Sequence, residues 1–233
     1  MKRIFSILFA LVMALSLAML PASVVQAANL YEHYNTWDNN SAPFHSANWL
    51  AQTFTAESDH SVTSVKLKLY RAGSPGTVTV SIRATDGSGH PTVPDLTSGT
   101  IDGSTVTNVS PGLWYEIALT SYDLTKDTKY AIVVRAPSGN TTNYLRWRFY
   151  ESVPPYAGGN RENSSNSGST WISELGKDFM FEVWGSVEVG GEVYPVNKLS
   201  VLTPWIVLVA AIIPVATIVI RRRRARSRYL NSQ

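Results

Sequence analysis

Short stretches in which apolar and polar side chains alternate recur through most of this chain. A period of two is typical of a β-strand with one face in the core and the other in solvent. Tyr130–Val134 is apolar on both faces, which indicates a central strand. Clusters of Gly, Pro, Asn, Asp and Ser separate the runs and indicate turns. The clearest alternating runs are Ser64–Tyr70, Thr77–Ala84, Leu113–Leu119, Tyr144–Tyr150 and Phe179–Trp184.

Weaker patterns complete the expected set of strands. We expect strands at Leu50–Thr55, around Leu96–Ile101 and near Trp171, and a long turn at Asn160–Ser169. Eight to ten short strands at this spacing predict an all-β domain, a jelly-roll-like β-sandwich. Helical periodicity is not evident between the two ends of the chain.

The C-terminal part predicts one transmembrane helix. Residues 201–220 carry no charge, and a helix of that length spans about 30 Å, the thickness of a bilayer core. Trp205 lies where an indole can sit at the interface, and a basic tail, 221–233, follows with Arg221, Arg222, Arg223 and Arg224 at its start. Arginines so placed mark the cytoplasmic side. The same layout also fits a sorting signal that is clipped after export, with Tyr194–Leu199 as its motif.

The N-terminus agrees with this topology. Residues 1–27 have a basic start, an apolar run and small residues at the end, the layout of a secretory signal peptide. A retained first membrane helix is the alternative. We therefore expect an extracellular domain at 28–187, a linker at 188–200 and a single-pass protein of the cell membrane, whose helix contacts lipid and whose C-terminus is cytoplasmic.

The net charge of +3 is that of the full sequence and differs from that of the part expected to be exported. Removing Lys2, Arg3 and the six tail arginines leaves 12 basic residues against 17 acidic ones, so the expected exported part, the domain with its linker, carries about −5. A nucleic-acid partner, which requires a basic surface, is not expected. The chain has no cysteine, which excludes disulfides, thiol catalysis and cysteine-bound metals; a domain of about 150 residues buries enough surface to fold without them.

Several strand sequences resemble those of a known family. Ser64–Arg71, Gly76–Ile82, Asp86–Pro91, Lys129–Val134 and Asp178–Val183 resemble the exported choice-of-anchor β-sandwich domains. That family has the architecture of carbohydrate-binding jelly rolls and attaches one domain type through different C-terminal anchors. The resemblance implies a surface-displayed domain and carries no catalytic motif.

Catalytic residues are not expected. The four histidines stand in no recognisable catalytic or metal-binding motif. A glycoside-acting enzyme would need two carboxylates held about 5–10 Å apart across a cleft, and the sequence pairs no two of its acids in this way. An enzyme with a cryptic carboxylate site is the less favoured alternative.

No cofactor is required, although a structural calcium ion is a hypothesis. Loops of secreted β-sandwiches often bind calcium through carboxylate and carbonyl oxygens. The candidate ligands are Asp38, beside two asparagines, Asp86, in a Gly-Ser-Gly loop, and Asp178, at the head of the last strand.

The strand Tyr144–Tyr150 is the best candidate for a binding site. If Leu145, Trp147 and Phe149 enter the core, the opposite face presents Tyr144, Arg146, Arg148 and Tyr150. Aromatic rings that stack on sugars, flanked by guanidinium donors, can bind saccharides. Trp37, Trp49 and Trp114 could line a site or fill the core. The sequence thus favours a non-catalytic binding or adhesion module for a glycan or a surface protein, with a structural envelope protein that lacks a ligand as the alternative.

Overall fold

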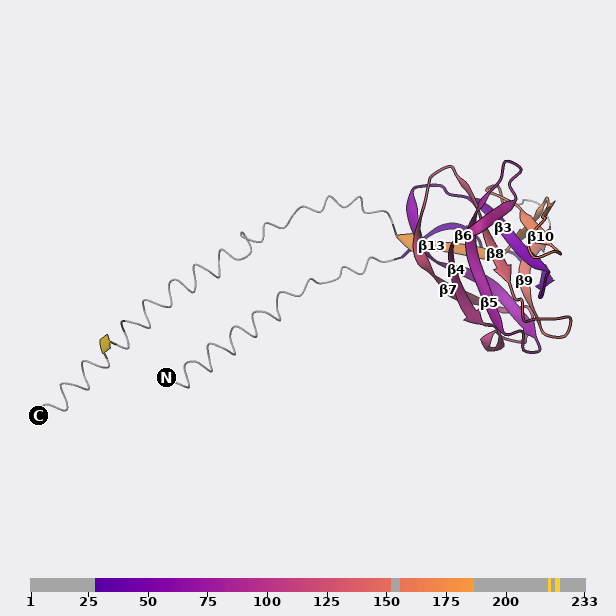
Figure 1. Ribbon diagram of the computed structural model, residues 1–233, viewed down its shortest axis with the longest axis horizontal. Coiled ribbons are helices and arrows are strands. Elements are labelled where there is room, and N and C mark those ends of the chain that lie inside the picture. Colours follow the sequence, from indigo (N-terminus) through magenta and orange to yellow (C-terminus); the bar gives the residue numbers. More distant parts are fainter. Residues whose placement is uncertain (1–27, 152–155, 187–217, 219–220, 223–233) are drawn as a thin grey trace, which may run out of the picture. The chain divides into compact units, whose positions relative to one another are not determined.

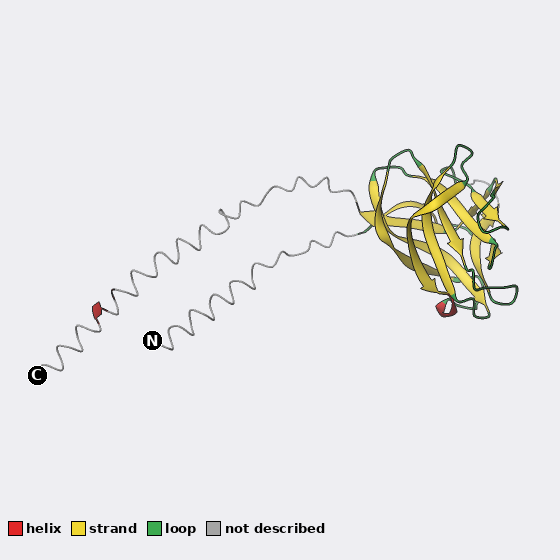
Figure 2. Cartoon of the chain, viewed as in Figure 1, coloured by secondary structure: helices red, strands yellow, loops and turns green. Residues whose placement is uncertain are grey.

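Two antiparallel β-sheets face each other in the domain (Figures 1 and 2). The computed structural model describes residues 28–151, 156–186, 218, 221 and 222. The seven-stranded sheet contains β1 (Asn29–Tyr34), β2 (Asn40–Phe44), β4 (His60–Ala72), β7 (Leu113–Leu124), β9 (Tyr144–Glu151), β12 (Lys177–Phe179) and β13 (Phe181–Ser186). The six-stranded sheet contains β3 (Trp49–Thr55), β5 (Thr77–Thr85), β6 (Pro91–Asp102), β8 (Lys129–Arg135), β10 (Arg161–Ser164) and β11 (Ile172–Glu174).

The strand order brings together segments that are far apart in sequence. One sheet runs β1-β13-β4-β9-β12, with β2 paired to β9 and β7 to β4, and the other runs β11-β10-β3-β8-β5-β6. The strand β8 lies between β3 and β5, as its two apolar faces predict. A short 3-10 helix, Gly103–Thr105, follows β6. The expected all-β, two-sheet fold is confirmed.

The predicted alternation places the core between the sheets. Leu67 and Leu69 of β4, Val80 and Ile82 of β5 and Trp147 of β9 are all fully buried. The Trp147 indole stacks on Phe179 with ring centroids 4.2 Å apart. A register shift in β4 between Val62 and Ser64 changes the phase of the alternation, and Val62 and Val65 are both buried as a result.

Three polar strands were not revealed by the pattern. The sequences of β1 and β2 show no clear alternation, and Arg161–Ser164, expected to be part of a turn, forms β10. This part of the turn prediction was wrong because β10 pairs with β3 on one side and β11 on the other. Its backbone hydrogen bonds come from tertiary pairing, which a polar sequence does not signal.

Most of the predicted membrane-related segments lie outside the described residues. These are the signal peptide, the linker, Trp205, Arg223, Arg224 and nearly all of 201–220. The chain divides into two units, Met1–Glu188 and Val189–Gln233, and Ile218, Arg221 and Arg222 of the second are helical. Within the described residues, no helix has the length and apolarity that crossing a bilayer requires. The anchor and its topology remain predictions from the sequence.

Candidate functional site

The β9 strand presents the predicted face, with one difference. Leu145, Trp147 and Phe149 are buried in the core, and Tyr144 and Tyr150 are half-buried on the outer side. Arg146 is also half-buried there, but Arg148 is only 9% exposed. Arg148 therefore presents little surface to a ligand, and its part in binding stays a prediction.

Arg148 is held by Asp38, one of the three predicted calcium ligands. The Arg148 Nε donates to Asp38 Oδ2 at 2.5 Å, and the Lys68 Nζ donates to Asp38 Oδ1 at 3.2 Å. Burial alone raises the pKa of Asp38, but the hydrogen bonds from Arg148 and Lys68 outweigh it and lower the pKa below its ordinary value. Two cations thus already satisfy this carboxylate.

The Asp38 ion pairs lie where β4 and β9 of the seven-stranded sheet stop pairing with each other. The strands β12 and β13 are separated by Met180; β12 pairs with β9 and β13 pairs with β4. The Met180 N–H donates to the Arg148 carbonyl at 2.9 Å, and the Met180 carbonyl accepts from the Trp147 indole at 2.9 Å and the Lys68 N–H at 3.5 Å. Asp38 therefore connects the side chains of β4 and β9 at the point where these strands diverge.

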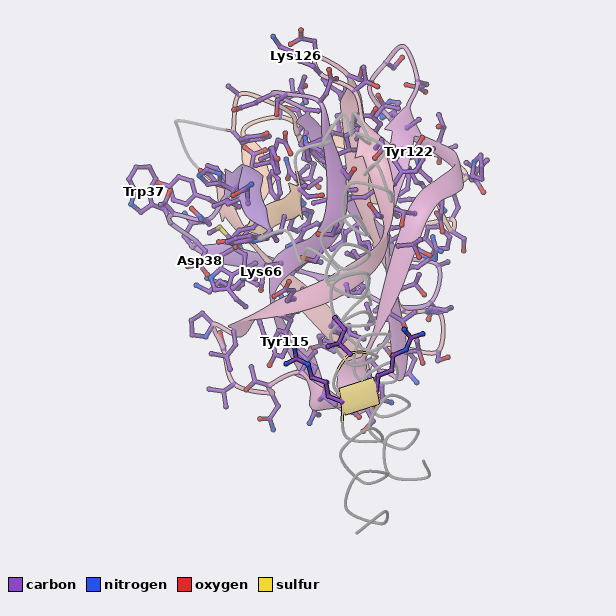
Figure 3. The ribbon with its side chains drawn as sticks, turned by 90° about the vertical axis from the view of Figure 1, so that its left-hand side faces the viewer. Trp37, Asp38, Lys66, Tyr115, Tyr122 and Lys126 are labelled. Carbon is purple, nitrogen blue, oxygen red and sulfur yellow. The ribbon has the colours of Figure 1, made fainter. Side chains whose placement is uncertain are left out.

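The loop that carries Asp38 exposes the side chain of Trp37 to solvent. The Trp37 side chain is 63% exposed, and its backbone has φ of 60°, in the left-handed region. Its ring lies 6.1 Å from that of Tyr150, which in turn lies 6.5 Å from Tyr34. Figure 3 shows Trp37 projecting outward at one side of the domain, with Asp38 next to it. A bulky residue in this backbone region adds strain of about 1 kcal/mol.

Side-chain hydrogen bonds fix this loop, residues 35–39, at both ends. The Asn35 amide donates to Glu182 of β13 at 2.9 Å, and the Glu151 N–H donates to Asn39 at 3.0 Å. With the Asp38 ion pairs between them, these contacts hold Trp37 in one place. Its exposure is therefore a property of an ordered loop.

Arg146 belongs to a second group of polar contacts farther along β9. Its Nη1 donates to the Ser41 carbonyl at 3.2 Å and to the Ser41 hydroxyl at 3.1 Å. The Ser41 hydroxyl also shares a hydrogen bond of 2.8 Å with the Tyr70 hydroxyl, and the Arg146 guanidinium lies 5.7 Å from the Tyr144 ring. We call the surface formed by Trp37, Ser41, Tyr70, Tyr144, Arg146 and Tyr150 the Trp37 face.

The neighbouring part of the same sheet has more acidic character. The Lys66 Nζ lies 4.2 Å above the Trp184 ring and 3.8 Å from the Glu116 carboxylate. The Trp184 indole donates to Glu182 at 2.8 Å. Lys66 is thus surrounded by an indole and two carboxylates, whereas the Trp37 face carries the guanidinium of Arg146.

The three tryptophans left open by the sequence have different surroundings. Trp37 belongs to the Trp37 face, and Trp114 is half-buried on β7, opposite Lys68 of β4. Trp49 lies on the other sheet, where the guanidinium groups of Arg83 and Arg135 are 5.5 and 5.3 Å from its ring. Only Trp37 among them is exposed.

The candidate calcium ligands do not come together. Asp86 accepts the backbone N–H groups of Ser88 and His90 at 2.8 and 2.9 Å, within its own turn. Asp178 is buried, which raises its pKa, and accepts from the Gln52 amide at 2.9 Å and the Tyr156 N–H at 2.8 Å. Across residues 28–151 and 156–186, no group of three or more His, Asp or Glu side chains could hold a metal ion. Calcium binding stays a hypothesis from the sequence.

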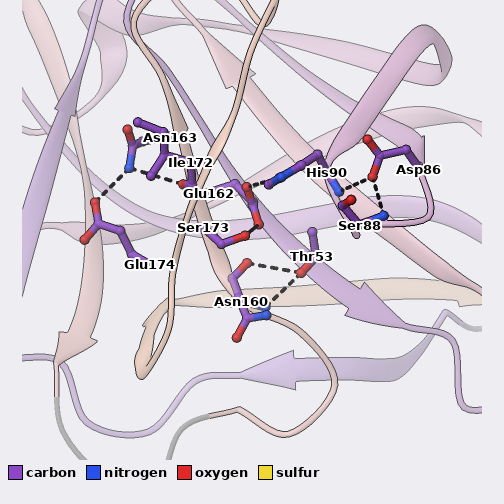
Figure 4. A network of polar contacts seen from close by, with 10 residues as sticks. All are labelled: Thr53, Asp86, Ser88, His90, Asn160, Glu162, Asn163, Ile172, Ser173 and Glu174. Atoms are coloured by element: carbon purple, nitrogen blue, oxygen red, sulfur yellow. Dashed lines mark hydrogen bonds and ion pairs between the residues drawn. The ribbon is translucent and has the colours of Figure 1, made fainter.

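A Glu–His–Ser group on the six-stranded sheet superficially resembles catalytic residues (Figure 4). The buried Glu162 accepts a hydrogen bond from the Ser173 hydroxyl and lies 2.9 Å from the His90 Nδ1. A serine nucleophile requires the imidazole between hydroxyl and carboxylate, whereas here the carboxylate is in the middle. The group instead connects the β5–β6 turn to the β10–β11 hairpin.

Comparisons with known proteins give likenesses of fold only. No family model matches the chain, and no curated protein matches it. Among solved structures, the chain is similar to the cysteine protease and lectin-like domains of Cwp84, a surface layer associated protein of Clostridium difficile, with 16% identity, a TM-score of 0.45, and 69% of this chain and 36% of that chain covered. It is also similar to SACOL2612, a CocE/NonD family hydrolase from Staphylococcus aureus, with 11% identity, a TM-score of 0.32, and 71% and 36% covered.

This chain spans about a third of the length of each of these two structures. At such identities and TM-scores, neither likeness assigns a function to this chain. The resemblance to choice-of-anchor domains remains an interpretation of the strand sequences.

Proposed function

We propose that this protein is a surface-anchored, non-catalytic module that binds glycans through the Trp37 face. The observation that carries the proposal is the 63% exposure of the Trp37 indole in a backbone conformation that is strained for a bulky residue. Strained residues persist where the surrounding structure fixes them, and they are frequent at ligand sites. An exposed indole beside a tyrosine ring supplies the flat apolar surfaces on which sugar rings stack.

The spacing along β9 supports an extended ligand. Arg146 and Tyr150 are four residues apart on one face of the strand, a distance of about 13 Å. A ligand that contacts the ring of Tyr150 and the polar group around Arg146 must span that distance, as an oligosaccharide does. The strand order β1-β13-β4-β7 in one sheet and β3-β8-β5-β6 in the other supports the jelly-roll architecture that the resemblance implies.

The anchor completes the proposal. The signal-like N-terminus, the uncharged segment 201–220 and the arginines after it support a domain held outside the cell membrane by one C-terminal helix. In that position a binding module would meet glycans or proteins of the cell surface.

Oligosaccharide arrays test binding by Trp37. The sample is the full chain, purified in a detergent without a sugar headgroup. We expect saturable binding that falls at least about 10-fold in Trp37→Ala and Tyr150→Ala, because each substitution removes a stacking surface. The matched control is Leu175→Ala, which removes another exposed apolar side chain (76% exposed) on the β11–β12 turn and should leave binding unchanged.

Thermal unfolding of the same variants separates binding from folding. Trp37→Ala should unfold close to the wild-type temperature, because little of the indole is buried. Folded protein that binds no saccharide, or a Trp37→Ala variant that binds as tightly as wild type, would overturn the proposal and favour the structural alternative.

A further inference from the structure

The charges at the Trp37 face do not cancel. Lys68, Arg146 and Arg148 contribute three positive charges on β4 and β9, and Asp38 contributes one negative charge between two of them. Glu151, next to Tyr150, is paired with Lys177 at 3.0 Å. Glu182, which accepts from the Asn35 amide of the Trp37 loop, adds a second negative charge. The surface around Trp37 thus keeps one positive charge in excess, in an exported part whose net charge is about −5. A neutral sugar would not require this excess.

Arg146 is the cation that can receive an anionic group. Both hydrogen bonds of its guanidinium to Ser41 use Nη1, and no carboxylate among the described residues pairs with it. The Nε and Nη2 edge therefore remains for a ligand. Two parallel N–H groups on this edge match the two oxygens of a carboxylate. Lys68 and Arg148, by contrast, already bind Asp38.

The adjacent acidic part of the sheet limits where an anionic ligand can lie. Glu116 and Glu182 flank Lys66 and Trp184, so a negatively charged chain would be repelled there. The favourable path instead follows β9, from the rings of Trp37 and Tyr150 to the guanidinium of Arg146. Aromatic and anion-binding groups thus follow one another along a single strand face.

We infer that the ligand of the Trp37 face is an acidic saccharide, a chain of uronic acid units, whose rings stack on Trp37 and Tyr150 and whose carboxylate binds the Nε and Nη2 edge of Arg146. This inference rests on the proposed function. The inference adds to the proposed function the class of saccharide that is bound and the residue that selects this class.

The test measures how tightly the full chain binds two forms of one oligosaccharide, in the same detergent without a sugar headgroup. The probes are an oligogalacturonate and the same oligomer with its carboxylates methyl-esterified. We expect the acid form to bind at least about 10-fold more tightly, because a charge-assisted bidentate contact is lost on esterification. This difference should shrink as salt is raised.

Variants assign the preference to Arg146. Arg146→Gln should bind both forms with the affinity that wild type has for the ester, and Arg146→Lys should keep part of the preference, since it retains the charge but loses the paired N–H groups. Lys126→Gln is the control, because it removes one positive charge from the β7–β8 turn, which lies away from Trp37 in Figure 3. It should keep the full preference.

The outcomes distinguish this inference from the proposed function. Equal binding of acid and ester that is lost in Trp37→Ala would overturn the acidic-saccharide inference and leave glycan binding intact. Tighter binding of a sulfated glucan than of the oligogalacturonate would overturn the assignment to carboxylate. Binding of neither form, with no other saccharide bound by the folded chain, would overturn both proposals.

Discussion

The protonation and stability contribution of a single buried residue depend on the residues that it contacts, as the group around His60 shows. The half-buried Tyr31 packs on the buried pair Glu32 and His60. The Tyr31 and His60 rings stack at 3.8 Å, and the Glu32 Oε2 lies 3.5 Å from the His60 Nε2. The His60 Nδ1 lies 2.9 Å from the Ser58 carbonyl, so Nδ1 carries a proton. Without a second proton, two acceptors would face each other. The Glu32 Oε2 and the His60 Nε2 have no other hydrogen-bond partner among the described residues, so a protonated Glu32 would supply the missing donor.

We expect Glu32→Gln to stabilise the protein at neutral pH. Burial raises the pKa of Glu32, opposed by the Glu57 N–H and by His60, so the folded state binds a proton that the unfolded state releases at about pH 4.5. The stability that this group supplies is present below that pH and is lost as pH rises through the raised pKa. The Gln amide can donate to the His60 Nε2 without a titrating proton.

The expected gain in the free energy of unfolding for Glu32→Gln is about 1 kcal/mol at pH 7.5, shrinking towards zero near pH 4.5. Urea unfolding across this range measures it. Glu57→Gln, a change at an exposed neighbour, serves as the control and should have little effect. A variant that is less stable than wild type at pH 7.5 would show instead that a charged carboxylate and imidazolium stabilise the group.

At the scale of elements, the two sheets come into direct contact where β6 crosses β7. The Thr97 hydroxyl donates to the Thr120 carbonyl at 2.5 Å. A Cβ at Gly99 would lie 1.9 Å from the Ala118 carbonyl oxygen. The lack of a side chain at Gly99 therefore allows this edge of the sandwich to close.

We expect Gly99→Ala to lower the free energy of unfolding by about 2 to 3 kcal/mol, since the new methyl group would force the backbones of β6 and β7 apart. Gly87→Ala is the matched control, because a Cβ there would contact nothing within 4 Å. Chemical denaturation of both variants gives the comparison. Equal stability of the two would mean that the β6–β7 contact is looser than the structure indicates.

The elements were predictable to different degrees. Strands with one buried face, such as β4, β5 and β9, follow directly from their alternation, because burial of every second side chain is a local property of a strand. β1, β2 and β10 were missed, since their polar sequences become strands only by pairing with β13, β9 and β3. The loop between β1 and β2, which carries Trp37, was missed with them.

The β-sandwich domain is organised around one large core between its two sheets. Side chains from both sheets, including Phe54 of β3, Leu67 of β4, Ile132 of β8 and Trp147 of β9, belong to a single buried cluster. Residues 29–186 contain every described strand. Neither sheet can keep its inner face buried without the other, so the sandwich should be one cooperative unit.

We therefore expect the sandwich to unfold in one transition. In urea, the change in fluorescence of the seven tryptophans, which include the buried Trp147, should coincide with the loss of β-sheet circular dichroism. The free energy of unfolding should fall in the ordinary range of about 5–15 kcal/mol. Two separate midpoints would contradict a shared core.

The sequence by itself determined the class of fold, the core strands and the predicted export and anchoring signals, because these depend on local periodicity, length and charge. It also identified the face of β9 that carries Tyr144, Arg146 and Tyr150. Only the tertiary structure decided the roles of Asp38 and Arg148. These residues were predicted to belong to different sites, and they form an ion pair. They are 110 residues apart, and such a pairing is created when strands from distant parts of the chain meet in one sheet.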